Sequence, residues 1–101
     1  MSWMDRIVEQ YGQEYVLRQL AEESAELCQA ALKVVRAMHG ETPVTQVEAQ
    51  DQLLEEIADV KIMLNILIDV MLNDRGLQRI VEIRKKKETR MIERMLEGDG
   101  E

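Results

Sequence analysis

Four acidic residues occur in this chain as two pairs with the same spacing. Glu23 and Glu26 are three residues apart, and so are Glu56 and Asp59. On a helix, the two members of such a pair lie about 60° apart around the axis and one turn apart along it, so each pair projects from one face. Carboxylate oxygens suit Mg²⁺ or Mn²⁺, and Mg²⁺ fills its remaining positions with water and phosphate oxygens. The spacing therefore predicts a site that recruits Mg²⁺, or Mn²⁺, together with a phosphate-bearing molecule.

Both pairs interrupt stripes of apolar residues that mark the buried side of a helix. Leu20, Glu23 and Leu27 follow one another at helical spacing, and the stripe through Val60 leads back to Glu56. A carboxylate in a core position is costly unless it is protonated, paired with a cation or bound to a metal. One such pair alone is more typical of a solvated helix face. Two pairs on successive helices, both in register with a core stripe, favour a metal site.

The elements that must position these acids are helices. Apolar periodicity and end signals predict helices over residues 3–10, 14–38, 45–73 and 77–96. The first long helix should bury Val16, Leu20, Leu27, Ala31 and Val34. The second should bury Ile57, Val60, Met63 or Leu64, Leu67, and Val70 or Met71.

The ends of these helices carry their own signals. His39-Gly40 is a stop signal, and the second long helix begins with Thr42-Pro43 or with the capping box from Thr45 to Glu48. Asp74-Arg75-Gly76 is typical of a turn. We therefore expect an all-α fold, an antiparallel helical bundle of three main helices in one domain over residues 1–97, with 98–101 as a short flexible tail.

Composition limits the possible partners. The 101 residues carry a net charge of −7, which argues against nucleic-acid binding, although basic residues gather locally over 84–90. The only cysteine, Cys28, excludes an intrachain disulfide, and the only histidine, His39, has no acid three residues before it, as a ferritin-like di-iron site would need. No apolar stretch is long enough for a membrane span or signal region. The sequence predicts a soluble, cytoplasmic protein without a nucleic-acid or membrane partner. Since so short a chain leaves apolar helix surface to cover, a second subunit should complete it.

The acidic strings resemble the signature of the MazG-like family of all-α nucleoside triphosphate pyrophosphohydrolases, which is E-E-x-x-E, a spacer and E-x-x-D. Here the signature reads Glu22-Glu23-Ser24-Ala25-Glu26 and then Glu56-Ile57-Ala58-Asp59. The similarity is greatest to the short stand-alone members of bacteria and their phages. It implies a MazG-like four-helix arrangement in a homodimer or homotetramer, Mg²⁺, and cleavage of a nucleoside triphosphate to a monophosphate and pyrophosphate.

Roles for the residues follow from this chemistry and from the resemblance. The predicted metal ligands are Glu23, Glu26, Glu56 and Asp59. Either Glu22 or Glu55 would orient the attacking water, and the resemblance favours Glu22 because the family motif includes it. Positive charge must also meet the phosphates. The candidates for this role are Lys33, Arg36, Lys86, Lys87 and Arg90.

Other interpretations of the same residues remain open. The basic run over 84–90 is also typical of a solvated helix end. The whole chain is also compatible with a non-catalytic helical oligomerisation module, or with a regulatory protein that binds nucleotides without turning them over. Pyrophosphate release with and without Mg²⁺ separates these three functions.

Overall fold

The computed structural model describes residues 1–99, and within them the chain forms helices and no strand. In chain order, the elements are α1 (Trp3–Tyr11), α2 (Gln13–Met38), α3 (Gln46–Ile66), the π-helix η1 (Leu67–Met71) and α4 (Asp74–Asp99). They form two compact units, Met1–Met71 and Leu72–Glu101. The predicted all-α class is confirmed for the described residues. None of their helices combines the length and apolar character needed to cross a membrane.

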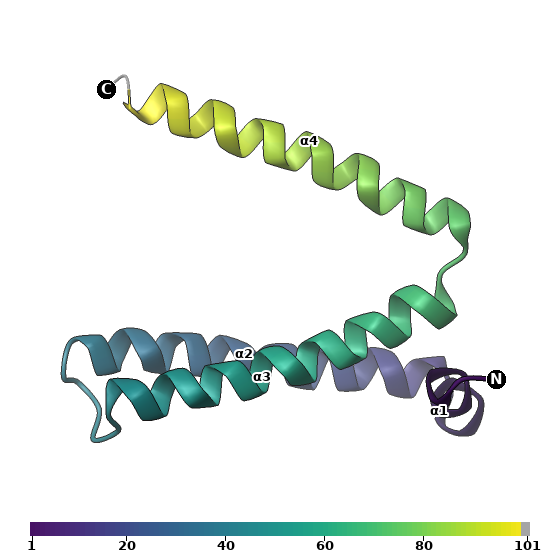
Figure 1. The fold of residues 1–101 in the computed structure, drawn as a ribbon, viewed down its shortest axis with the longest axis horizontal. Coiled ribbons are helices and arrows are strands. Elements are labelled where there is room, and N and C mark those ends of the chain that lie inside the picture. The colour runs from purple at the N-terminus through teal and green to yellow at the C-terminus, as the bar shows by residue number, and fades with distance from the viewer. Residues whose placement is uncertain (100–101) are drawn as a thin grey trace. The chain divides into compact units, whose positions relative to one another are not determined.

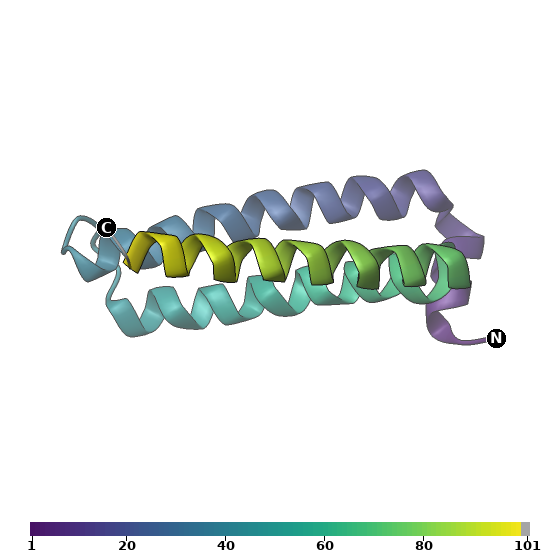
Figure 2. The same ribbon diagram turned by 90° about the horizontal axis from the view of Figure 1, so that it is seen from above.

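The start of the first unit is determined locally. The Ser2 hydroxyl accepts a hydrogen bond from the Asp5 N–H at 3.2 Å, and the Asp5 carboxylate accepts one from the Ser2 N–H at 3.0 Å, which completes a capping box. Gly12 ends α1 with a φ of 89°, a conformation that other residues rarely adopt. The chain can therefore turn sharply into α2, and α1 lies across the end of the α2–α3 pair (Figures 1 and 2).

The connection between α2 and α3 combines two helix-end motifs. The N–H of Gly40 bonds to the carbonyl of Ala37 at 3.2 Å, and the N–H of Glu41 bonds to that of Arg36 at 2.8 Å, as in a Schellman motif. Gly40 has a φ of 68°, which fits its place after the helix. The capping box at Thr45 then starts α3, which decides between the two predicted starts of this helix.

Because this connection is short, α2 and α3 run antiparallel and pack along their length (Figures 1 and 2). Near α1, the core is a cluster of Val16, Met63 and Ile66, with Leu20 among the residues packed against it. Towards the connection, the buried residues are small: Ala30 is 7% exposed and Ala49 is fully buried. The site lies between these two regions.

The predicted stripes were correct at some positions and displaced at others. Ala30 is buried while the predicted Ala31 is exposed, so α2 is rotated by about one residue at this end. Ile57 is 37% exposed, and Ile66, which was not predicted, is 2% exposed. The buried positions of α3 follow a spacing of three from Val60 to Ile66, and the chain then widens into the π-helix, which the periodicity did not indicate.

The second unit is essentially one helix. Its start differs from the prediction, because Asp74, Arg75 and Gly76 form the first turn of α4 instead of a separate turn. The Asn73 side chain accepts the Gly76 N–H at 2.9 Å and so caps this helix. At the other end, residues 98 and 99 of the predicted tail belong to α4, and residues 100–101 lie outside the described part.

Candidate functional site

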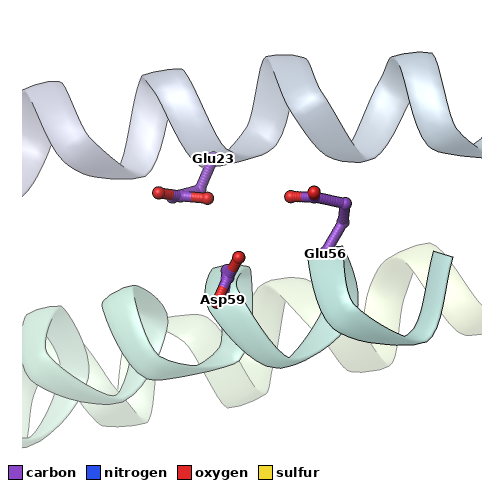
Figure 3. Close-up of side chains that lie close together, drawn as sticks. All are labelled: Glu23, Glu56 and Asp59. Atoms are coloured by element: carbon purple, nitrogen blue, oxygen red, sulfur yellow. The ribbon is translucent and has the colours of Figure 1, made fainter. Parts of the chain in front are cut away.

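Three of the four predicted metal ligands come together between α2 and α3. Glu23 projects from α2, and Glu56 and Asp59 project towards it from α3 (Figure 3). One carboxylate oxygen from each lies within 4.8 Å of the other two. Glu23 and Glu56 are half-buried, whereas Asp59 is exposed. We call these three residues the acidic cluster.

The acidic cluster results from the register of the two helices. Glu23 lies between Leu20 and Leu27 in the stripe that faces α3, and Glu56 lies one turn before the buried Val60. The apolar residues on either side of Glu23 and Glu56 along their helices pack between α2 and α3. This packing makes the two carboxylates face each other across the helix pair. The apolar contacts decide this approach, since the carboxylates themselves repel.

Two carboxylate oxygens of the acidic cluster are buried without a group that compensates for the loss of water. Oε2 of Glu23 and Oε2 of Glu56 are both buried and have no hydrogen-bond partner in the described part of the chain. A buried carboxylate oxygen without a donor is unfavourable, and a proton or a bound cation removes the cost. Among ligands, a hard divalent cation fits this set, because all the donors are carboxylate oxygens and the site is partly open to water.

The same cause perturbs the protonation of both glutamates. Burial is the main factor that raises the pKa of Glu23, followed by the negative charges of Glu26 and Asp59. Burial likewise raises the pKa of Glu56, and the charge of Glu26 is the next largest cause. In both cases the nearby carboxyl of Glu26 favours the protonated form of the glutamate and so raises its pKa. The fourth predicted ligand, Glu26, therefore adjoins both glutamates, although it is outside the group of three.

A groove of about 550 Å³ begins at Glu26 and Glu56 and leads towards the α2–α3 connection. Lys33 and Arg36 line it from α2, so two of the predicted phosphate-binding residues lie beside the acids. No ion pair in the described residues involves either of these cations. An anionic chain held at the acidic cluster through a metal would therefore continue into a positively charged groove.

The groove lies on one side of the helix pair for a simple reason. Three residues of α2 each come one position before a residue that faces α3, namely Glu26, Gln29 and Lys33. On α3, two residues come one position before a residue that faces α2, namely Gln52 and Asp59. Because the helices are antiparallel, this one-residue step leads to the same side of the pair on both. Gln29 and Gln52, which sequence reasoning missed, line the groove for this reason. The sequence feature that could have indicated them is their position one residue before a residue of the core.

The remaining predicted residues are all exposed. Glu22 is exposed, and its carboxylate accepts a hydrogen bond from the Gln19 amide at 3.4 Å. Glu55 is also exposed, as expected for a solvent-facing acid. Lys86, Lys87 and Arg90 are exposed on α4, where Arg84 pairs with Glu88 at 2.7 Å. Searches against protein-family models, curated proteins and solved structures found no match for this chain.

Proposed function

We propose that this protein is a Mg²⁺-dependent nucleoside triphosphate pyrophosphohydrolase, which releases a nucleoside monophosphate and pyrophosphate. The observation that carries this proposal is the junction of the acidic cluster with the groove that contains Lys33 and Arg36. Carboxylates alone are common without function, but here two of their oxygens are buried without partners. Unpaired cations lie beside them, and a metal-bound polyphosphate satisfies both sets of charges.

In this proposal, each residue has one task. Glu23, Glu56 and Asp59 hold Mg²⁺, or Mn²⁺, and Glu26 completes the set. A bound Mg²⁺ would neutralise charge on the phosphate oxygens and lower the pKa of bound water. Glu22, held by Gln19, orients the attacking water. Lys33 and Arg36 hold the leaving pyrophosphate, while Lys86, Lys87 and Arg90 remain candidates for further phosphate contacts.

The proposed assembly is a homodimer or homotetramer, in which helices of a second copy complete the bundle. Large apolar side chains remain exposed on α2 and α3, including Leu17 at 50% and Leu54 at 63%. Exposed apolar surface of this kind is typical of a chain that associates.

The decisive experiment measures pyrophosphate release from ribo- and deoxyribonucleoside triphosphates with Mg²⁺ and with EDTA. We expect turnover that requires the metal and that Asp59→Asn abolishes. Asp51→Asn is the matched control, because Asp51 is an exposed acid on the same helix and outside the acidic cluster. Nucleotide binding without turnover would instead support the regulatory protein, and absence of both would support the structural module.

A further inference from the structure

Tyr11 and Tyr15 form an exposed aromatic stack where α1 meets α2. Their ring centroids are 4.8 Å apart, and the planes of the two rings differ by 29°. Tyr11 ends α1 and Tyr15 lies in the first turn of α2, so the turn at Gly12 brings the two rings together. Tyr11 is 51% exposed and Tyr15 is 39% exposed. We call this pair the tyrosine stack, and much of its surface is open to a ligand.

The tyrosine stack lies in line with the groove along α2. Tyr15 comes one residue before the fully buried Val16, just as the groove residues of α2 come one residue before residues that face α3. Lys33 follows Tyr15 by 18 residues, which is about five full turns, so the two side chains start from the same side of α2. Glu26 lies only about 20° from this line. Along one side of α2, the order is therefore the tyrosine stack, the acids and the cations of the groove.

This order matches the parts of a nucleoside triphosphate held at the acidic cluster. Tyr15 is eight residues before Glu23, or about 12 Å along the helix, which is comparable with the length of a ribose and its base. Lys33 is ten residues beyond Glu23, or about 15 Å, and its long side chain shortens the remaining gap to a pyrophosphate group. A nucleotide that places its scissile phosphate at the acidic cluster thus reaches the tyrosine stack at one end and the groove at the other.

The groove itself offers little to a nucleobase. The chain contains three aromatic residues, and none of them lines the groove, whose residues are mostly charged or amide-bearing. Such groups suit phosphate oxygens, which accept charge-assisted hydrogen bonds. The flat face of a base gains more from stacking on an aromatic ring. The chemistry of the two ends therefore assigns the phosphates to the groove and the base to the tyrosine stack.

We propose that the base of the nucleotide stacks on the tyrosine stack, in contact with Tyr15, and that the substrate lies along α2 with its pyrophosphate towards the α2–α3 connection. Every base has a π-face, so this subsite accepts purines and pyrimidines alike. The inference rests on the proposed function for the class of ligand. Its test measures binding, so it does not depend on turnover.

Calorimetric titration with the two parts of the substrate, in the presence of Mg²⁺, tests this orientation. The probes are inorganic pyrophosphate and the four monophosphates AMP, GMP, CMP and UMP. We expect Tyr15→Ala to weaken the binding of all four monophosphates about 10-fold and to leave the binding of pyrophosphate unchanged. Tyr15→Phe keeps the ring and should bind them like the native protein. Lys33→Gln should show the opposite pattern, with weaker binding of pyrophosphate only.

Trp3→Ala is the matched control, because Trp3 is an aromatic residue of α1 that is 58% exposed and outside the tyrosine stack. It should bind every probe like the native protein. Unchanged binding of the monophosphates by Tyr15→Ala would overturn the inference, and so would their failure to bind the native protein. An equal loss of pyrophosphate binding in Tyr15→Ala would also overturn it, since Tyr15 would then act through the fold.

Pyrophosphate release from the same samples separates this inference from the proposed function. If the native protein hydrolyses nucleotides and Tyr15→Ala has an unchanged KM, the inference is wrong and the proposed function stands. If the native protein binds monophosphates through Tyr15 but never releases pyrophosphate, the proposed function is wrong and the base subsite stands.

Discussion

Glu23 on α2 and Glu56 on α3 face each other, and each holds one carboxylate oxygen that is buried without a hydrogen-bond partner. Such an arrangement makes the metal-free protein less stable than a protein with a neutral group at the same place. A ligand that binds only the folded state then adds stability by mass action. The sign of a stability change therefore separates a metal site from a structural ion pair.

Replacing Asp59 by Asn removes one charge at nearly constant volume. We expect Asp59→Asn to be at least as stable as the native protein in EDTA, because repulsion within the acidic cluster falls. The native protein should gain about 1.4 kcal/mol when Mg²⁺ is ten times its dissociation constant, and the variant should lose this gain. Hydrolysis should fall at least about 100-fold.

Thermal unfolding with and without Mg²⁺ measures the stabilities, and Asp51→Asn should behave like the native protein. If Asp59→Asn were destabilised and still hydrolysed nucleotides, the metal-site assignment would be wrong.

The raised pKa values of Glu23 and Glu56 predict how stability depends on pH without metal. Above the ordinary glutamate pKa of about 4.3, the folded protein binds these protons more tightly than the unfolded chain. Stability should therefore fall as the pH rises through the raised pKa values, and it should be lowest above them. Glu23→Gln cannot ionise at this position, so it should lose part of this dependence.

Urea unfolding in EDTA between about pH 5 and pH 8 measures the effect as the difference between the native protein and Glu23→Gln, which cancels the titration of other groups. A difference that stays constant over this range would contradict the burial of the Glu23 carboxylate. Saturating Mg²⁺ should remove most of the dependence.

Lys33 and Arg36 should act on the substrate and not on the fold. Neutralising either by Lys33→Gln or Arg36→Gln should lower kcat/KM about 10- to 100-fold, as expected for the loss of one charge-assisted hydrogen bond. The melting temperature should hardly change, since neither side chain takes part in an ion pair of the described chain. Arg18→Gln, which removes an exposed cation of α2 outside the groove, is the control. If all three variants had the same kcat/KM, the groove would not be part of the substrate-binding site.

Lys86, Lys87 and Arg90 provide a separate test on α4. If they contact phosphates, the triple variant with Gln at these positions should raise KM while the free energy of unfolding changes little. The increase should shrink at high salt, because exposed charges are screened. If KM did not change, the basic residues over 84–90 would form a solvated helix face and would not contact the substrate.

The sequence alone determined the features that depend on neighbouring residues. The capping box at Thr45, the stop at Gly40 and the predicted helices over residues 3–10 and 14–38 all rest on interactions within a few residues, and these predictions agree with the structure. The pairing of acids at a spacing of three is local in the same sense. It placed both pairs near the buried side of their helices before any tertiary contact was known. Where local signals compete, as at Asp74 to Gly76, a side-chain cap from Asn73 favoured the helix over the turn.

Only the tertiary structure decided how α2 and α3 are rotated against each other. Ala30 is buried in place of Ala31, and the packing of α2 on α3 brings Glu23 opposite Glu56 and leaves Glu26 at the start of the groove. Apolar periodicity specifies a helix face only to within about one residue, or 100°. The burial of two carboxylate oxygens is sensitive to that last residue, because it depends on which side chains from the other helix meet them.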